Sequence, residues 1–203
     1  MTDSAPAAPQ NRIVIGVTGA SGALYAFRLV KALLTRDFEV HLVASSAGRQ
    51  VIRQELPEHA GSSETVFTGL PDGRFHVYLE KDFFAPYCSG SFRFRAMVVI
   101  PATMGTVGAI ASGAVTNAIH RAADVALKEK IPLVVVPRET PLSTVHLRNL
   151  LTLSEAGAVI LPPMPAFYNA PESLGDHVDF IVSRVLDQLG IENDMTRRWG
   201  ERT

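Results

Sequence analysis

Residues 12–34 read "RIVIGVTGASGALYAFRLVKALL" and contain a strand pattern, a glycine-rich turn and a helix pattern in immediate succession. The first six residues are mostly apolar and β-branched, as in a strand that is covered on both faces. After the turn, Ala26, Leu29, Val30 and Leu33 follow the i, i+3, i+4, i+7 spacing of a helix with one buried face. A strand that leads directly into a helix predicts the first half of a βαβ unit.

Further apolar runs repeat this arrangement, and amphipathic helix patterns separate most of them; the runs cover residues 39–44, 96–101, 132–137 and 157–162. Alternating strands and helices favour right-handed crossovers and a parallel sheet. We therefore predict a single α/β domain, built as a doubly wound, Rossmann-like (flavodoxin-like) parallel sheet flanked by helices. Residues 56–95 are the least regular, although "RFHVYL" (74–79) is a candidate further strand.

The composition fits one globular domain without a charged binding face. A chain of 203 residues that is 47% hydrophobic can bury one substantial core. The net charge of -1 gives no indication of a nucleic-acid partner or of an anionic membrane surface. Cys88 is the one cysteine, which excludes an internal disulfide and a thiolate-rich zinc site and suits a reducing cytoplasm.

One long uncharged segment and the two ends of the chain differ from the rest of the sequence. Residues 96–115 are uncharged and about as long as a membrane span, but glycines, a proline and hydroxyls interrupt them. We predict a short strand, a turn and a helix of small residues there. Residues 1–11 lack the pattern of a signal peptide and are expected to form a disordered tail, with the domain over residues 12–191 and a second tail over residues 192–203.

Ligands of open parallel sheets bind beyond the carboxyl ends of the strands. The first strand is followed by "TGASGA" (18–23), which suits a phosphate or is simply a tight turn. Ser45 and Ser46 follow the second strand. The segment "PATMGT" (101–106) comes later, and its small residues and hydroxyls suit a flavin or a turn with its own hydrogen bonds.

The run at 132–137 is followed by "RETPLS" (138–143). Thr140 is expected to cap the next helix, with Pro141 in the first turn, so that Arg138 and Glu139 lie beside a helix N-terminus. In that position Arg138 is suited to bind an anion, and the Glu139 carboxylate is suited to accept and donate protons. Glu139 is equally suited to complement the helix dipole.

Arg121 and Lys128 lie two turns apart in a predicted helix over residues 117–130, so they can present two cations in one direction. A solvated salt-bridge stripe through Asp124 is the alternative, and spacing alone favours it.

The loop "LPPMPAFYNAP" (161–171) carries Tyr168 on a proline-stiffened backbone. It is either the wall of a binding site or a polyproline ligand for another protein. Arg184, in the last long helix, is a candidate anion ligand or an ordinary surface arginine.

A nicotinamide-dependent reductase is disfavoured. Tyr25 stands where the fingerprint TGxxGxxG has its third glycine, and the second strand ends in Ala44, Ser45 and Ser46 rather than in a carboxylate for the ribose. The chain also lacks a tyrosine followed four residues later by lysine, the catalytic pair of short-chain reductases.

Several stretches together resemble the UbiX-like flavin prenyltransferases: "GVTGASGALYAFRL", "SSAGRQVIRQE", "SGS", "RAADVALKEK", "PLVVVPRETPLS", "HLRNLL", "GAVILPPMPAFYNAP" and "VLDQLGI". The resemblance implies transfer of a dimethylallyl group from dimethylallyl phosphate to N5 and then C6 of reduced FMN, which makes prenylated FMN for UbiD-like decarboxylases. FMN is then both cofactor and prenyl acceptor. No DDxxD motif is present to hold magnesium, so no metal site is predicted.

The resemblance also implies residue roles. The implied FMN contacts are Gly19, Ala20, Ser21, Ser45, Thr103, Met104, Gly105, Thr106 and Arg138. The implied phosphate clamp is Arg121, Lys128, Tyr168 and Arg184. Ser21, Glu55 and Glu139 are the implied residues that position or relay protons, and Lys128 is also a candidate catalytic residue. Members of the family assemble as dodecamers with sites at subunit boundaries, so Tyr168 and Arg184 are candidates to serve a neighbouring chain.

Ala102-Thr103 replaces the family's frequent Cys-Ser, Ser46 replaces a common lysine, and Phe83-Phe84 stands where some members have tryptophan. The choice between monophosphate and diphosphate donors stays open. A cysteine decarboxylase-type flavoprotein is one alternative, but its PxMNxxMW stretch is missing and His41 does not have the context of its catalytic histidine. A non-catalytic FMN-binding or polyproline interaction protein is the other.

Overall fold

The computed structural model describes residues 11–62, 64–71 and 73–200, and nearly all of the predicted first tail lies outside them. The elements are β1 (Arg12–Val17), α1 (Ala23–Leu34), β2 (Glu39–Ala44), α2 (Ser46–Glu55), β3 (Phe75–Leu79), the 3-10 helix η2 (Pro86–Cys88), β4 (Ala96–Ala102), α3 (Met104–Ala111), α4 (Ala118–Lys128), β5 (Leu133–Pro137), α5 (Thr144–Glu155), β6 (Val159–Ile160) and α6 (Leu174–Gln188).

The strands form one six-stranded sheet in the order β3-β2-β1-β4-β5-β6. Every pairing is parallel. The order changes direction between β1 and β4, where the connections from neighbouring strands leave toward opposite sides. Such a switch point opens a crevice at the carboxyl edge of the sheet.

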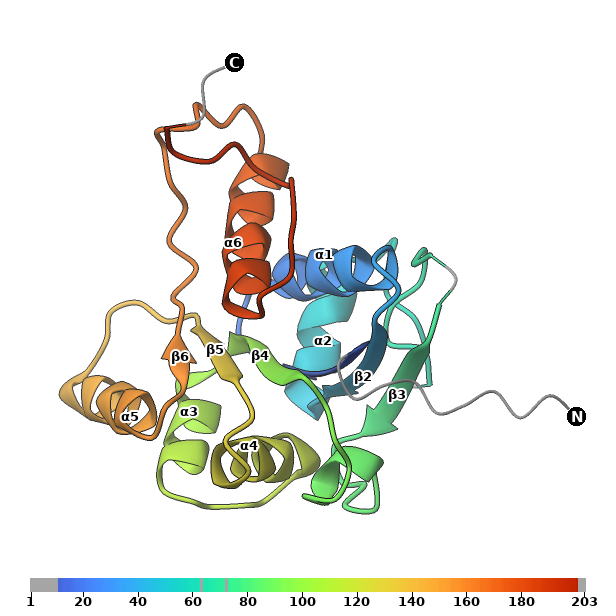
Figure 1. Cartoon of the computed structure of the whole chain (residues 1–203), viewed down its shortest axis with the longest axis vertical. Helices are drawn as coiled ribbons and strands as arrows, with labels where there is room; N and C mark the ends of the chain where they lie inside the picture. Colours follow the sequence, from blue (N-terminus) through green and yellow to red (C-terminus); the bar gives the residue numbers. More distant parts are fainter. Residues whose placement is uncertain (1–10, 63, 72, 201–203) are drawn as a thin grey trace, which may run out of the picture.

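Helices cover both faces of the sheet, as Figure 1 shows. One core cluster joins α1, α2 and α6 to Ile13, Ile15 and Val17 of β1. The other joins α3, α4 and α5 to Val14 of β1 and its neighbours on that face. Alternate side chains of a strand point to opposite faces, so the apolar runs supply both clusters at once. The predicted doubly wound sheet is confirmed.

The irregular segment does contain a strand, because β3 covers most of "RFHVYL" and pairs with β2 at the edge of the sheet. The uncharged segment 96–115 divides into β4 and α3, as predicted. Among the described residues, no helix has both the length and the apolar character of a membrane span. The predicted strand over 157–162 is shorter than expected: it is regular only at Val159 and Ile160.

Candidate active site

The turn between β1 and α1 depends on two glycines for different reasons. A Cβ atom on Gly19 would lie 2.6 Å from the Cβ atom of Ala47 at the start of α2. Gly22 has a φ of 115°, a conformation that residues with side chains rarely adopt. Glycine therefore lets this turn approach α2 closely and enter α1 without strain.

Glu55, the last residue of α2, holds the first amides of α1. Its Oε2 accepts hydrogen bonds from the backbone N–H groups of Gly22 at 2.9 Å and of Ala23 at 2.8 Å. Gly22 is the N-cap of α1 and has no side chain with which to satisfy those donors. A carboxylate from 33 residues away in sequence supplies the missing cap. These two amides therefore bind a protein anion, whereas the sequence left a phosphate site and a plain tight turn open for this segment.

Hydrogen bonds join the turns at the carboxyl edge into one unit. The hydroxyl of Thr18 donates to the carbonyl of Pro101 at 2.7 Å and accepts from the N–H of Thr103 at 2.8 Å. Nε of Arg138 donates to the carbonyl of Ser21 at 3.1 Å. Predicted residues that follow β1, β4 and β5 thus meet at the edge beside the switch point.

Two helices begin at this edge with side-chain caps. Ser45 accepts from the N–H of Gly48 at the start of α2, and Thr103 accepts from the N–H of Thr106 at the start of α3. The positive ends of both helix dipoles therefore face the crevice. A Cβ atom on Gly105 would meet nothing closer than 4.0 Å, so the surface beside the start of α3 is open.

The predicted cap of α5 is wrong. Ser143, not Thr140, is the N-cap: its hydroxyl accepts from the N–H of His146, while His146 Nδ1 accepts from the N–H of Ser143. This reciprocal pair satisfies two donors, so the helix begins later than Pro141. Arg138 and Glu139 consequently lie in a loop that precedes the helix. Glu139 is exposed and accepts from the N–H of Thr140 at 3.0 Å.

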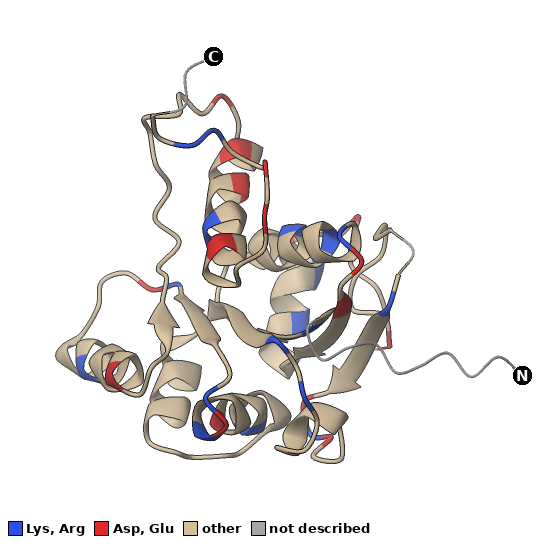
Figure 2. Cartoon of the chain, in the orientation of Figure 1, with Lys and Arg blue, Asp and Glu red and all other residues tan. Residues whose placement is uncertain are grey.

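Arg121 and Lys128 lie on α4 and already have carboxylate partners. Arg121 Nη1 lies 2.6 Å from Asp124, and Lys128 Nζ lies 2.5 Å from Glu129. Of the salt-bridge stripe considered as the alternative, only the pair Arg121–Asp124 is present, since Lys128 pairs with Glu129 instead. Figure 2 shows the basic and acidic residues side by side on this helix.

Cys88 and the adjoining loop "SGS" (89–91) contact the same cations. Nε of Arg121 donates to the carbonyl of Cys88 at 3.0 Å, and a Cβ atom on Gly90 would lie 2.8 Å from Lys128 Nζ. Glycine at position 90 therefore leaves the space that the ammonium group occupies. Burial raises the pKa of the Cys88 thiol to about 11, against the opposing effect of Arg121, so the thiol stays protonated at neutral pH.

The proline-rich loop leaves the sheet after β6 and runs beside α6 toward the chain end (Figure 1). The ring of Tyr168 meets Trp199 edge-on with centroids 4.9 Å apart, and it also contacts Phe180 of α6. Arg184 is exposed on α6 and pairs with Asp187 at 2.7 Å. Because α4 and α6 cover opposite faces of the sheet, one chain does not bring Tyr168 and Arg184 together with Arg121 and Lys128.

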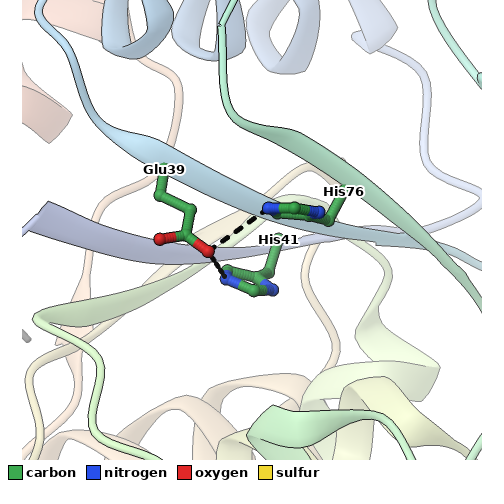
Figure 3. Close-up of side chains that lie close together, drawn as sticks. All are labelled: Glu39, His41 and His76. Atoms are coloured by element: carbon green, nitrogen blue, oxygen red, sulfur yellow. Dashed lines mark hydrogen bonds and ion pairs between the residues drawn. The ribbon is translucent and has the colours of Figure 1, made fainter. Parts of the chain in front are cut away.

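The sequence reasoning missed one polar cluster. Glu39 and His41 on β2 and His76 on β3 point toward one another (Figure 3), with both imidazoles at hydrogen-bond distance from Glu39 Oε1. Burial lowers the pKa of His41 to about 4, although Glu39 acts in the opposite direction. Burial raises the pKa of Glu39, but the hydrogen bond from Arg12 and the nearby histidines outweigh it and hold that pKa below its usual value. The sequence did offer one signal for this cluster, the Glu-x-His pattern of residues 39–41 in a predicted strand. The third residue, His76, lies in the segment 56–95, for which the sequence predicted structure least clearly.

Known proteins resemble this chain over most of its length. The family model described as Flavoprotein matches residues 2–186. The flavin prenyltransferase UbiX of Halalkalibacterium halodurans is 48% identical over 190 residues, covering 92% of each chain. A dodecameric FMN-dependent UbiX-like decarboxylase from Escherichia coli O157:H7 is 43% identical, with a TM-score of 0.84, and the match covers 94% of this chain and 100% of that one.

A third similar structure is AnUbiX (PadA1), solved in complex with FMN and dimethylallyl pyrophosphate. It is 39% identical, with a TM-score of 0.84, and the match covers 95% of this chain and 99% of that one. The sequence likeness is far above the level at which only a fold is shared, and it includes the segments that build the carboxyl edge. The chain therefore belongs to the flavoprotein family and, within it, to the UbiX-like flavin prenyltransferases.

Proposed function

We propose that this protein transfers a dimethylallyl group from dimethylallyl phosphate to reduced FMN. The observation that carries the proposal is the likeness to AnUbiX, whose solved complex contains FMN and dimethylallyl pyrophosphate, along 95% of this chain. Reduced FMN would supply N5 and C6 for the two new bonds. As the N5–C bond forms, the C–O bond to phosphate breaks and N5 loses its proton; as the C6–C bond forms, the middle carbon of the alkene takes up a proton and C6 loses its own.

The carboxyl edge is the proposed FMN site. Two helix N-termini and the open surface beside Gly105 suit an anionic flavin nucleotide. We assign FMN contacts to Gly19, Ala20, Ser21, Ser45, Thr103, Met104, Gly105, Thr106 and Arg138. The backbone carbonyl of Ser21 and Nε of Arg138 are already joined, so the arginine is held at the edge before FMN binds.

Arg121 and Lys128 are the proposed cations for the departing phosphate. Their partners Asp124 and Glu129 sit in half-exposed or exposed ion pairs, which are weak in water and readily exchanged. A donor phosphate then replaces these carboxylates and gains two charge-assisted contacts. Such contacts favour the reaction most as negative charge develops on the leaving group.

Glu139 and Ser21 are proposed to position or relay protons at the flavin, since both are exposed at the edge. Glu55 is proposed to act mainly as a positioning residue. Its carboxylate accepts hydrogen bonds from the backbone N–H groups of Gly22 and Ala23, and so holds the turn that contains Ser21 in place.

A shared site between chains is proposed for Tyr168 and Arg184. They lie with α6 on the opposite face from α4, so a neighbouring chain would have to present them to Arg121 and Lys128. Large apolar side chains close to Tyr168 in sequence are exposed, with Phe167 75% and Leu174 71% accessible. Burying such a surface against further copies favours an oligomer, and the similar Escherichia coli protein is dodecameric.

A UbiD-like decarboxylase is the proposed recipient of prenylated FMN, and the cytoplasm is the proposed compartment. Both the monophosphate and the diphosphate of dimethylallyl alcohol belong in the donor tests.

The decisive experiment mixes purified protein with reduced FMN and dimethylallyl phosphate without oxygen, and then identifies the flavins by mass spectrometry. We expect a flavin heavier than reduced FMN by one dimethylallyl group less one hydrogen atom. A parallel reaction without donor is the control. Tight FMN binding with no new flavin species, using either donor, would refute the prenyl transfer.

Replacing Glu55 with alanine is expected to raise the Kd for FMN about tenfold, equivalent to about 1.4 kcal/mol. The reason is that the Ser21 turn loses the carboxylate that anchors Gly22 and Ala23. Quenching of flavin fluorescence measures the binding. Glu58→Ala, at an exposed site three residues further on, serves as the control. Equal FMN binding by the Glu55 variant and the wild type would contradict the positioning role.

A further inference from the structure

The cluster of Glu39, His41 and His76 lies apart from every residue assigned to prenyl transfer. Glu39 and His41 are two residues apart on β2, and His76 is in register with His41 on β3. In parallel strands, residues in register share a face, as do alternate residues of one strand. All three side chains therefore converge on one face of the sheet, as Figure 3 shows.

The spacing of the ligand atoms suits a metal ion. Nε2 of His41 lies 3.1 Å and Nε2 of His76 lies 3.2 Å from Oε1 of Glu39. In a tetrahedral zinc site with bonds of about 2.0–2.1 Å, neighbouring ligand atoms are about 3.3 Å apart. All three ligand atoms lie within 4.8 Å of one another, so a small movement of the carboxylate admits an ion between the two imidazoles.

We propose that Glu39, His41 and His76 form a binding site for a divalent transition-metal ion, with zinc the best match. Two imidazoles and one carboxylate are a donor set that binds zinc, and they suit calcium or magnesium poorly because those ions prefer oxygen ligands.

Neighbouring groups hold the three ligands in place. Nδ1 of His41 lies 2.9 Å from the Tyr78 hydroxyl, so Nε2 is the ring nitrogen directed at the cluster. Nε of Arg12 donates to Oε2 of Glu39 at 3.3 Å, which leaves Oε1 for the ion. Outer hydrogen bonds of this kind orient metal ligands and are typical of metal sites. The charge of Arg12 opposes the ion, so the Glu39 carboxylate is an essential part of the site.

The two histidines differ in exposure, which gives a metal ion a path from solvent to the cluster. The His41 side chain is only 4% exposed, and the ring of Phe92 packs edge-on against it, which fixes its orientation. The His76 side chain is 46% exposed and connects the cluster to solvent. An ion can therefore reach a preformed buried imidazole from the side of His76.

The proposed ion has a structural role. It joins β2 to β3, which is the edge strand of the sheet and has a neighbour on only one side. His41 lies four residues before Ser45, about 13 Å along the strand from the flavin edge. We therefore expect zinc to stabilise the fold without taking part in the chemistry.

Zinc titration of the full-length, metal-stripped protein tests the site. Isothermal titration calorimetry is expected to give one zinc ion per chain, and micromolar zinc is expected to raise Tm. His76→Gln retains an amide that can donate to Glu39 but removes the imidazole ligand. We expect this variant to bind zinc at least tenfold more weakly, and to lose the rise in Tm. His177→Gln, outside the cluster, is the matched control and should behave as wild type.

Two results would overturn the proposal. One is the absence of stoichiometric zinc binding by the wild type. The other is equal zinc affinity of the wild type and the His76→Gln variant, which would place the ion elsewhere. In either case the cluster is an ion-pair network of Arg12, Glu39 and the two histidines. Circular dichroism of the variant checks that it is folded, since His76 is half exposed and its replacement leaves the core unchanged.

Discussion

Lys128→Gln is expected to lower kcat/KM for dimethylallyl phosphate by about 10²–10³-fold, the usual loss when one group that stabilises developing negative charge is removed. FMN binding should change much less, because the proposed flavin contacts lie at the carboxyl edge and Lys128 lies at the end of α4. Stability should hardly change, since the Lys128–Glu129 pair is exposed. Initial rates under anaerobic conditions and a separate FMN titration measure the two effects.

Lys130→Gln is the matched control, because Lys130 is an exposed lysine only two residues further along the chain. It should retain nearly full activity. If both variants lose activity equally, the effect is one of general surface charge. If Lys128→Gln remains fully active, the phosphate clamp is wrongly assigned.

Mixing two inactive variants is expected to restore activity if sites are shared between chains. Lys128→Gln disables the α4 side of a site, and Arg184→Ala disables the α6 side. When the two chains are unfolded together in equal amounts and reassembled, about a quarter of the sites combine an intact α4 side with an intact α6 side. Activity should therefore rise from about 1% or less to about a quarter of the wild-type value.

The matched control mixes Lys128→Gln with Arg121→Ala. Both changes lie on α4, so every site retains one defect and no recovery is expected. A failure of Lys128→Gln and Arg184→Ala to complement, with the oligomer intact by light scattering, would mean that α4 and α6 do not meet across a subunit boundary. The prenyl transfer itself would still stand.

The order of strands and helices was predictable because its signals are local. Uninterrupted apolar runs such as residues 13–17 mark strands covered on both faces, and apolar spacing of three and four residues marks helices. The edge strand β3 was harder to recognise. None of its residues is fully buried, as expected for a strand with a neighbour on one side only, and its segment also carries many turn residues.

The start of α5 shows where local signals compete. The prediction followed Thr140-Pro141, which fits the rules for a helix start, and did not consider Ser143, whose hydroxyl is of the same capping type. The reciprocal hydrogen bonds of Ser143 and His146 settle the choice, since they satisfy two backbone donors at once.

By itself, the sequence determined the α/β class, the parallel sheet and the family, because these depend on residue periodicity and on motifs read in order. It did not determine which distant groups meet. Glu55 reaches Gly22, Arg138 reaches Ser21, and His41 faces His76, through strand order and register. It also did not determine that α4 and α6 lie on opposite faces of the sheet. Such pairings follow from how strands cross over in space, and no local pattern of residues encodes that geometry.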